Sequence, residues 1–392
     1  MTPAARVASA SEILDMILEG TAAEKALTTW ARGSRFAGSK DRAAVRDHVF
    51  QALRCMRSYA ALGGAEVPTG RSLMLGALRA NGTDLASIFS GEGHAPQPLS
   101  EDELAGGRAA VAGAEAADIP DWLWPEFEAA LGAEAGAEAA LMRERADVFL
   151  RVNTVMATVA EAQAALAEEG GVTEPHPLSP TALRVVEGGR RVRLTHAFDD
   201  GFVELQDAAS QAVVDWLPLE GTARVLDYCA GGGGKSLAMT AQTDARIVAS
   251  DIAPERMKDL PARSTRAGAA IAIRTPEELA AEPAFDLVLC DAPCSGSGAW
   301  RRAPEGKWRL TEERLQELGE AQLEVLKAAR GHVADAGTLA YVTCSILRRE
   351  NEEMVARFEA ECPEWVCTSS QRWHPSMGGD GFFGALFARK KV

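Results

Sequence analysis

From residue 222 onward, segments typical of β-strands alternate with segments typical of α-helices, and this alternation limits the fold more than any other feature. Strands that alternate with helices form a mainly parallel sheet, because each helix returns the chain to the edge where the next strand begins. The residues that follow the strands then lie at one edge of the sheet, where ligands of such folds bind. The expected strands are 224–228, 246–250, 270–274, 286–290 and 338–343, with a final strand, 382–388, after a glycine-rich turn as in a hairpin.

The first 147 residues carry helical periodicity and no strand signal, so we expect an all-helical module over residues 1–147. Short strand candidates begin at residue 148, and residues 148–215 are typical of a small α+β subdomain. Residues 216–392 would then form the α/β domain, and 392 residues have room for such a division. In the front module the expected helices include 72–80, 101–112 and 122–146.

Cysteine and histidine usage argues against disulfides and metal sites. The chain has seven cysteines, an odd number, without a Cys-x-x-Cys pair, so we expect reduced thiols in a cytoplasmic protein. The six histidines are scattered, and we expect no metal. No apolar run approaches the roughly 18 residues of a membrane span, and the N-terminus lacks the apolar segment of a signal peptide. We expect a monomer without a membrane partner.

The net charge of -15 argues against generic nucleic-acid binding, which depends on basic surface. Basic residues nevertheless gather in two places, between Arg32 and Arg57 and between Arg301 and Arg309. A local basic track can bind nucleic acid even when the whole chain is acidic. Two solvated helix faces are the alternative interpretation.

A glycine-rich loop follows the first strand of the α/β domain: Asp227-Tyr228-Cys229-Ala230-Gly231-Gly232-Gly233-Gly234-Lys235-Ser236. Glycines let the backbone approach a ligand closely, and three cofactors compete for such a loop. A dinucleotide fingerprint needs glycine where Ser236 stands, and a phosphate-binding Walker loop needs glycine where Cys229 stands. S-adenosylmethionine fits better, with Asp227 at its charged methionine end and Asp251, after the next strand, at its ribose hydroxyls. A tight turn with a helix cap is the alternative interpretation.

Two cysteines follow two other strands, Cys294 after Asp291-Ala292-Pro293 and Cys344 after Thr343. Methyl transfer to carbon 5 of a pyrimidine needs a thiolate that adds to carbon 6, because carbon 5 is otherwise a poor nucleophile. An acid near ring nitrogen 3 stabilises the charge that develops. Asp291, the two thiols and the glycine loop supply groups of these types. The remaining candidates Cys55, Cys290, Cys362 and Cys367 lack such a setting and are expected to be small buried side chains.

With these motifs the chain resembles the Sun-type family of RNA cytosine-C5 methyltransferases, especially its RsmB/Fmu-like branch. The resemblance covers about residues 148–390. It includes both cysteine motifs, Arg301-Arg302, Pro304, Trp308, Glu350-Asn351-Glu352 and Asp380-Gly381-Phe382-Phe383. Arg151-Val152-Asn153-Thr154 and Gln206-Asp207 resemble segments that precede the family's catalytic domain. The front module resembles, more weakly, the NusB-like RNA-binding module of this branch.

The resemblance implies a Rossmann-like methyltransferase domain with an antiparallel last strand, preceded by a small α+β RNA-binding subdomain. Cys344 would be the nucleophile, Cys294 would assist product release, Asp291 would contact the base, and Lys235 would lie near cofactor and base. The implied cofactor contacts are Asp227, Cys229, Ala230, Gly231, Gly232, Gly233, Gly234, Lys235, Asp251, Arg256, Asp291 and Pro293. The implied RNA contacts are Arg35, Lys40, Arg42, Arg151, Asn153, Arg301 and Arg302.

Two departures from the family pattern concern the cofactor. The family loop usually carries proline where Gly232 stands and threonine where Ser236 stands. The family also usually has an acid after the third strand, where this chain has Arg274-Thr275-Pro276-Glu277, so no residue is predicted to contact the adenine.

The substrate implied by the resemblance is 16S ribosomal RNA, with transfer RNA as the alternative. A second function stays open, a ribosome-assembly factor that binds RNA and methylates it only secondarily. The presence of both Cys294 and Cys344 favours catalysis. A nucleoside-triphosphatase is disfavoured because the Walker pattern fails at Cys229.

Overall fold

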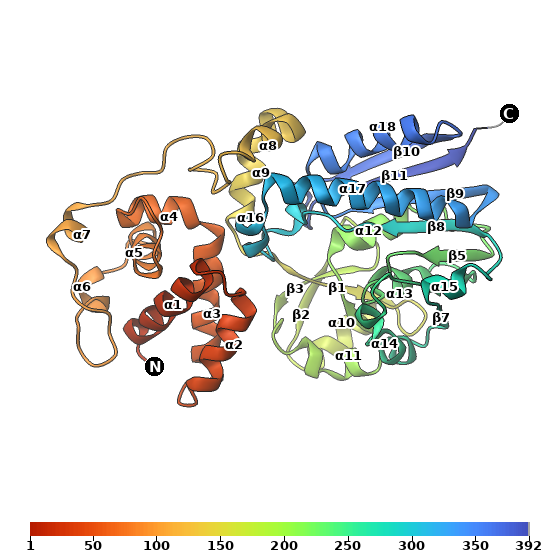
Figure 1. The fold of residues 1–392 in the computed structure, drawn as a ribbon. Coiled ribbons are helices and arrows are strands. Elements are labelled where there is room, and N and C mark those ends of the chain that lie inside the picture. The colour runs from red at the N-terminus through yellow and green to blue at the C-terminus, as the bar shows by residue number, and fades with distance from the viewer. Residues whose placement is uncertain (391–392) are drawn as a thin grey trace. The chain divides into compact units, whose positions relative to one another are not determined.

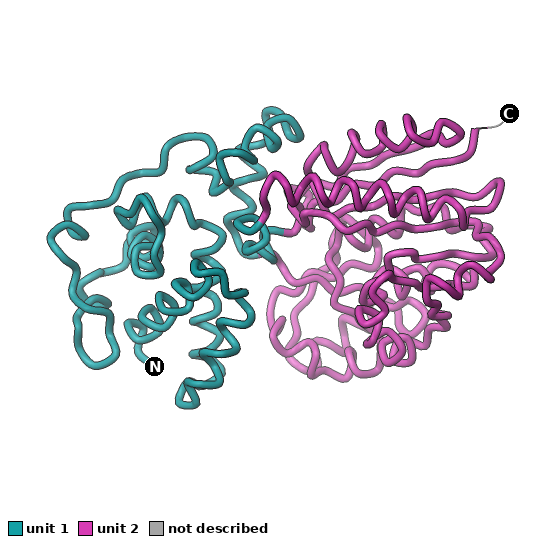
Figure 2. The backbone as a smooth tube through the Cα atoms, in the orientation of Figure 1, with its two compact units in different colours: residues 1–145, 300–309 teal, residues 146–299, 310–392 magenta. Residues whose placement is uncertain are grey.

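The computed structural model describes residues 1–390, and the chain divides into two compact units (Figure 2). Unit 1 comprises residues 1–145 and 300–309. Unit 2 comprises residues 146–299 and the chain from residue 310 onward. Within the described residues, no helix is both long enough and apolar enough to span a membrane.

Unit 1 is built from helices packed around an apolar core (Figure 1). Gly70 and Gly76 allow α5 to pack closely, because a Cβ at either position would lie 1.9 Å from the backbone oxygen of Ser11 or Tyr59. The helices are α1 (Pro3–Leu18), α2 (Ala23–Gly33), α3 (Ser39–Arg54), α4 (Met56–Gly63), α5 (Gly70–Ala80), α6 (Leu85–Ile88), α7 (Glu101–Ala105), α8 (Trp124–Leu131), α9 (Ala135–Met142) and α16 (Glu305–Arg309).

Two of the expected helices are shorter than the sequence suggested. The helix expected over 101–112 ends at Ala105, because Gly106 and Gly107 follow and Gly107 has a φ of 98°. The helix expected over 122–146 is divided at Gly132, which has a φ of 55°. Left-handed backbone of this kind interrupts a helix and favours glycine.

Residues 300–309 belong to unit 1, whereas the sequence placed them inside a continuous domain over 216–392. The reason is the end of α3, whose last carbonyl oxygens have no partner within the helix. The Trp308 Nε1 donates to the Leu53 oxygen at 2.6 Å, and the Lys307 Nζ donates to the Arg54 oxygen at 3.1 Å. The Arg54 Nε donates in return to the Arg301 oxygen at 2.6 Å.

Unit 2 begins with a small antiparallel sheet in the order β2-β3-β1-β4. Its strands are β1 (Val148–Val152), β2 (Val172–Pro175), β3 (Ala182–Glu187) and β4 (Val203–Leu205), and α10 (Val159–Glu168) buries Ala162 and Leu166 in the same core. The sequence did not predict β2. This strand is short, lies at the edge of the sheet and is largely exposed, so it has no apolar pattern to detect.

The larger sheet of unit 2 has the order β10-β11-β9-β8-β5-β6-β7. Strands β9, β8, β5, β6 and β7 pair in parallel, and β11 pairs antiparallel with both β9 and β10, as the sequence predicted for the last strand. The strands are β5 (Arg224–Asp227), β6 (Arg246–Ala249), β7 (Ile271–Ile273), β8 (Phe285–Asp291), β9 (Val333–Thr343), β10 (Trp365–Trp373) and β11 (Phe382–Arg389). The sequence missed β10, whose central residues are polar and exposed.

Alternate residues of the parallel strands fill two cores, one on each face of the sheet. Leu226 and Val288 pack with side chains of α17 (Glu312–Ala329) and α18 (Glu352–Glu361). Val225 and Leu287 pack with side chains of α12 (Ala208–Trp216) and α13 (Gly234–Thr240). Because both faces are covered, the carboxyl edge of the sheet is where its polar groups collect. Asp227 and Asp291 end their strands there, and Cys344 follows β9 directly.

The buried Lys307 predicts a pH-dependent stability. Burial lowers its pKa from 10.5 to about 8, so between these values the unfolded chain binds more protons than the folded chain. The free energy of unfolding should therefore rise from pH 8 to pH 10. In Lys307→Met this rise should be smaller, as measured by urea unfolding at both pH values. Lys25→Met, at an exposed lysine, is the control; an equal rise in both variants would contradict the prediction.

Candidate active site

The glycine-rich loop joins β5 to α13 and is tied down at both sides. Gly231 and Gly233 have φ values of 51° and 77°, which disfavour other residues. A Cβ at Gly233 would lie 2.2 Å from a methyl carbon of Leu260. The Gly231 amide donates to the Asp251 carboxylate at 2.9 Å, and the Arg263 guanidinium donates to the Gly232 oxygen. The loop is thus held against the end of β6.

Asp227 carries an acceptor atom that no described residue satisfies. Its side chain is 1% exposed, and one oxygen accepts a hydrogen bond from the Ser236 hydroxyl at 2.6 Å. The other oxygen, Oδ1, is buried and has no partner among residues 1–390. Burial is the main cause that raises the pKa of Asp227 to about 7, with the Asp291 charge adding to it and the Ser236 hydrogen bond opposing it. A positively charged ligand group beside this carboxyl would stabilise its ionised form.

Asp251 lies two residues beyond β6 and is 1% exposed. Its carboxylate accepts the amides of Gly231 and Ala253, each at 2.9 Å, and pairs with the Arg256 guanidinium at 3.2 Å. The Arg256 side chain is 57% exposed, so it can move while Asp251 stays in place.

Cys229 and Ala230, in the glycine-rich loop, are half-buried. Burial raises the pKa of the Cys229 thiol, which therefore remains protonated.

Lys235 and Asp291 form an ion pair at 2.6 Å between Nζ and Oδ2. The Lys235 ammonium also lies 5.1 Å from the centre of the Phe382 ring. Burial alone would lower the pKa of Lys235, but the charge and hydrogen bond of Asp291, with a smaller contribution from Cys344, raise it above 10.5. The lysine is therefore a cation at neutral pH, beside both a carboxylate and a thiol.

The sulfur atoms of Cys294 and Cys344 lie 3.4 Å apart, although fifty positions separate them in the chain. The loops that carry them are joined by two backbone hydrogen bonds, Ala292 to Val342 at 2.9 Å and Gly298 to Cys344 at 3.0 Å. The hydrogen bond to Cys344 is the largest cause that raises the pKa of Cys294 well above 9.0, followed by burial and by the charges of Cys344 and Glu350. The raised pKa keeps Cys294 protonated at neutral pH, and its sulfur is in hydrogen-bond contact with that of Cys344.

The four cysteines that were not expected to take part in catalysis lie outside the two-cysteine contact. Cys55, Cys290 and Cys362 are buried, and Cys367 is half-buried on the edge strand β10. Pro293 is exposed between Asp291 and Cys294, and its carbonyl oxygen accepts a hydrogen bond from Gln322 at 3.0 Å.

Several predicted RNA contacts are buried instead. Arg151 is 2% exposed and donates from Nε to the Gln206 side chain at 2.7 Å. Asn153 is 3% exposed and donates to the backbone oxygens of Gly201 and Ala267. Both side chains are buried in this structure, which argues against a direct contact of either one with RNA. Their hydrogen bonds connect the small subdomain to neighbouring segments of unit 2.

In unit 1 the predicted basic contacts divide into two groups. Arg301 is 7% exposed and donates to the Arg145 oxygen at 3.3 Å, so its side chain is also withdrawn from RNA. Arg302, Arg35 and Lys40 are exposed. Arg42 is exposed as well, but its Nε donates to the Ala37 oxygen at 2.9 Å and so closes the loop before α3.

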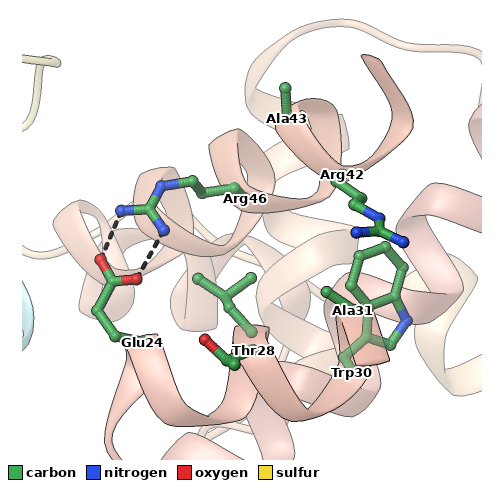
Figure 3. A pocket seen from close by; sticks show the side chains of 8 residues that line it. Glu24, Thr28, Trp30, Ala31, Arg42, Ala43 and Arg46 are labelled. Carbon is green, nitrogen blue, oxygen red and sulfur yellow. Dashed lines mark hydrogen bonds and ion pairs between the residues drawn. The ribbon is translucent and has the colours of Figure 1, made fainter. Parts of the chain in front are cut away.

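A shallow hollow of about 240 Å³ lies between α2 and α3 (Figure 3). Trp30 and Arg42 line one end of it, and the ion pair of Arg46 with Glu24 closes the other. Because Arg46 is already paired, it adds little to the basic surface that the sequence suggested.

Sequence reasoning missed Glu350 and Gln322. Both side chains are fully buried, and they bind each other next to the cysteine loops at 3.1 Å. Glu350 was visible only as part of a family motif without a role. Gln322 had no signal at all, since it lies within an otherwise ordinary amphipathic helix.

Comparison with known proteins relates the chain to one family of methyltransferases. Residues 214–385 match the profile of the 16S rRNA methyltransferase RsmB/F family, and residues 119–192 match that of the RsmF/B-like ferredoxin-like domain. The chain is related to the RsmB/F methyltransferases. The resemblance to the Sun-type family is thereby confirmed.

Curated relatives include ribosomal RNA small subunit methyltransferase B of Klebsiella pneumoniae, 32% identical over 286 residues, and that of Citrobacter koseri, 30% identical over 285. Each alignment covers 69% of this chain and 66% of the relative, slightly less than two thirds of those proteins.

Solved structures show the same fold. The crystal structure of PH0851 covers 99% of this chain and is itself covered to 99%, with a TM-score of 0.76 and 22% identity. A methyltransferase homologue from Pyrococcus horikoshii covers 70% of this chain, with 96% of its own length matched, a TM-score of 0.60 and 20% identity. The fold of this chain is therefore that of Rossmann-like methyltransferases with a mixed sheet.

The contact between the two thiols predicts that loss of Cys344 changes the pH at which Cys294 reacts with an alkylating reagent. Because the Cys344 sulfur is the largest cause of the raised pKa of Cys294, Cys344→Ala should lower that pKa. Alkylation of Cys294 by iodoacetamide, followed by peptide mass spectrometry from pH 6 to pH 10, should then begin at a lower pH than in the unmodified sequence. Cys367→Ala, distant in sequence and on β10, is the control. A Cys294 profile that stays unchanged in Cys344→Ala would contradict the contact.

Proposed function

We propose that the protein is an S-adenosylmethionine-dependent RNA cytosine-C5 methyltransferase whose substrate is 16S ribosomal RNA. The observation that carries the proposal is the contact between the Cys294 and Cys344 sulfurs, with the Lys235–Asp291 pair close enough to interact with Cys344. A nucleophilic thiol, a protonated thiol, a carboxylate and a cation are the groups that this reaction needs. The relatives named as small subunit methyltransferase B support ribosomal RNA rather than transfer RNA.

The cofactor residues fit S-adenosylmethionine. Its positively charged methionine end suits the unsatisfied, buried oxygen of Asp227, and its ribose hydroxyls suit the carboxylate of Asp251 once Arg256 turns aside. When bound, S-adenosylmethionine supplies an electrophilic methyl group. A structure of NSun6 from Pyrococcus horikoshii, which has the same fold, contains SFG, an analogue of this cofactor.

In the proposed reaction the Cys344 thiolate adds to carbon 6 of cytosine, and a C–S bond forms. The Lys235 ammonium, held in place by Asp291, stabilises the negative charge that the addition places on the ring. Carbon 5 then has the electron density to accept the methyl group. Once solvent water has taken the proton from carbon 5, the electrons of that C–H bond return to the ring, and the C–S bond breaks with release of the Cys344 thiolate.

Cys294 acts in the last step. Its sulfur lies within hydrogen-bond distance of the Cys344 sulfur, so its S–H group can donate a hydrogen bond to the thiolate as it departs. A hydrogen bond to the charged form makes that thiolate a better leaving group. The assignment of the two roles follows the family resemblance, and the raised pKa of Cys294 is consistent with it because this thiol stays protonated at neutral pH.

A function in ribosome assembly with only secondary methylation is the alternative. It would not require two sulfurs in contact, a paired lysine and an unsatisfied buried carboxylate at one sheet edge. These features favour catalysis as the main activity.

Removal of the Asp251 carboxylate should weaken cofactor binding. Asp251→Ala is expected to cost about 1–3 kcal/mol of binding free energy for S-adenosylmethionine, the scale of a lost buried acceptor. Isothermal titration calorimetry measures this directly, and Glu255→Ala, at an exposed carboxylate of the same segment, is the control. Binding of ATP or a nicotinamide cofactor in preference to S-adenosylmethionine would overturn the cofactor assignment.

Substitution of the two thiols should have opposite effects on the covalent intermediate. With 16S ribosomal RNA and S-adenosylmethionine, Cys344→Ala should neither methylate nor form an adduct, because no thiol adds to carbon 6. Cys294→Ala should accumulate a protein–RNA adduct that survives denaturing electrophoresis, because release is slowed. Cys290→Ser, at a buried strand position, is the matched control and should form no stable adduct. An adduct in Cys344→Ala that is absent in Cys294→Ala would reverse the roles.

A further inference from the structure

A buried glutamate connects the two loops that carry the cysteines. Glu350 is fully buried, and its carboxylate accepts the Ser295 amide at 2.7 Å and the Ser295 hydroxyl at 2.5 Å. The same carboxylate accepts a hydrogen bond from the Ser345 hydroxyl. Ser295 follows Cys294 and Ser345 follows Cys344, so one side chain binds the residue next to each thiol.

The glutamate is itself held from several directions. Gln322 donates from its amide to Glu350 at 3.1 Å and to the Pro293 oxygen at 3.0 Å. The Tyr341 hydroxyl donates to the Glu350 backbone oxygen at 2.6 Å. The next residue, Asn351, donates to the Ser345 oxygen at 2.9 Å and accepts from the Thr343 hydroxyl at 2.7 Å. A carboxylate with four donors and a fixed backbone has little freedom to move.

The position of this glutamate matters because strand pairing ends before the thiols. Past the Ala292–Val342 hydrogen bond, the loops of β8 and β9 are no longer held by a continuous ladder. Beyond this point the loops are joined by the Gly298–Cys344 backbone bond, by the Ile346 amide donating to the Ser297 hydroxyl at 3.0 Å, and by contacts of the Ser345 hydroxyl with those of Ser297 at 2.9 Å and Ser295 at 3.4 Å. The Glu350 carboxylate adds charged hydrogen bonds to both loops. Without the carboxylate, each serine would lose its strongest, charge-assisted partner.

We propose that Glu350 is the positioning residue of the thiol pair: its carboxylate, held by Gln322, fixes the Ser295 and Ser345 loops so that the Cys294 and Cys344 sulfurs stay in contact. The catalytic meaning of this role rests on the proposed function. The contact itself does not, because it is a property of the thiols that can be measured without RNA.

Electrostatics supports the same assignment. The Glu350 charge is one of the causes, after the Cys344 hydrogen bond, burial and the Cys344 charge, that raise the pKa of Cys294. The other titratable groups in this region are Tyr341, which is fully buried with a pKa raised mainly by burial, and the Lys235–Asp291 ion pair, whose lysine interacts with Cys344. Glu350 is therefore the carboxylate whose charge acts on Cys294.

The test is the pH profile of thiol alkylation in Glu350→Gln. The substitution preserves the shape of the side chain but removes its charge and replaces an acceptor oxygen with a donor. With iodoacetamide at pH 8, Cys294 should react roughly threefold faster than in the unmodified sequence, because loosening of the contact with Cys344, the largest cause of its raised pKa, adds to the loss of a nearby negative charge. Glu353→Gln, at an exposed glutamate of α18, is the control and should leave the profile unchanged.

Catalysis provides the second readout. In Glu350→Gln, kcat for RNA methylation should fall roughly tenfold with the KM for S-adenosylmethionine unchanged, because a misplaced nucleophile loses rate while the cofactor site is intact. In a Cys294→Ala background, Glu350→Gln should slow adduct formation to a similar extent. A variant that merely loses stability would lower the melting temperature without shifting the Cys294 profile.

The outcomes separate this inference from the proposed function. If RNA is methylated normally and Glu350→Gln matches Glu353→Gln in both the alkylation profile and kcat, the positioning role is wrong. If the alkylation profile shifts but no cytosine is methylated by the unmodified sequence, the proposed function is wrong and the positioning role stands. Should Glu350→Gln fail to fold, Ser345→Ala removes one of the same hydrogen bonds with a smaller change, and an unshifted Cys294 profile there would also overturn the proposal.

Discussion

The parallel pairing of β8 with β9 is the constraint on which the rest of the site depends. It aligns Asp291 with Val342, so the segments after both strands leave the sheet side by side. Two cysteines fifty positions apart in the chain thereby come within 3.4 Å of each other. Neither loop could achieve this alone, because each cysteine lies outside the hydrogen-bonded ladder and depends on the strand before it for its position.

Most of the buried charged groups near the thiols have partners within the protein, and one exception suggests where a ligand binds. Lys235 is paired with Asp291, and Glu350 is surrounded by donors. Asp227 differs, because one of its buried oxygens has no partner among the described residues. Leaving a buried polar atom unsatisfied is costly, which makes this carboxyl the natural place for a cationic group of a bound molecule.

The segment after the first cysteine motif has a separate structural task. The chain leaves unit 2 at residue 299 and returns to it at residue 310, and in between it completes the end of α3 in unit 1. Trp308 and Lys307 bind the last carbonyl oxygens of that helix, which would otherwise be unsatisfied. A motif that resembles a catalytic family segment therefore also stabilises the helical unit, and its basic side chain Arg301 is buried rather than presented to RNA.

The sequence by itself determined the parallel sheet and the polar residues at its carboxyl edge, because strand periodicity and strand ends are local properties. Asp291, Cys294 and Cys344 could be chosen as candidates for that reason. Only the tertiary structure decided which groups meet: Glu350 between two serines, Arg151 and Asn153 buried within unit 2, and the edge strands β2 and β10. Hydrogen bonds between distant segments and the burial of charged side chains depend on how the elements pack, and a local pattern of residues does not record this.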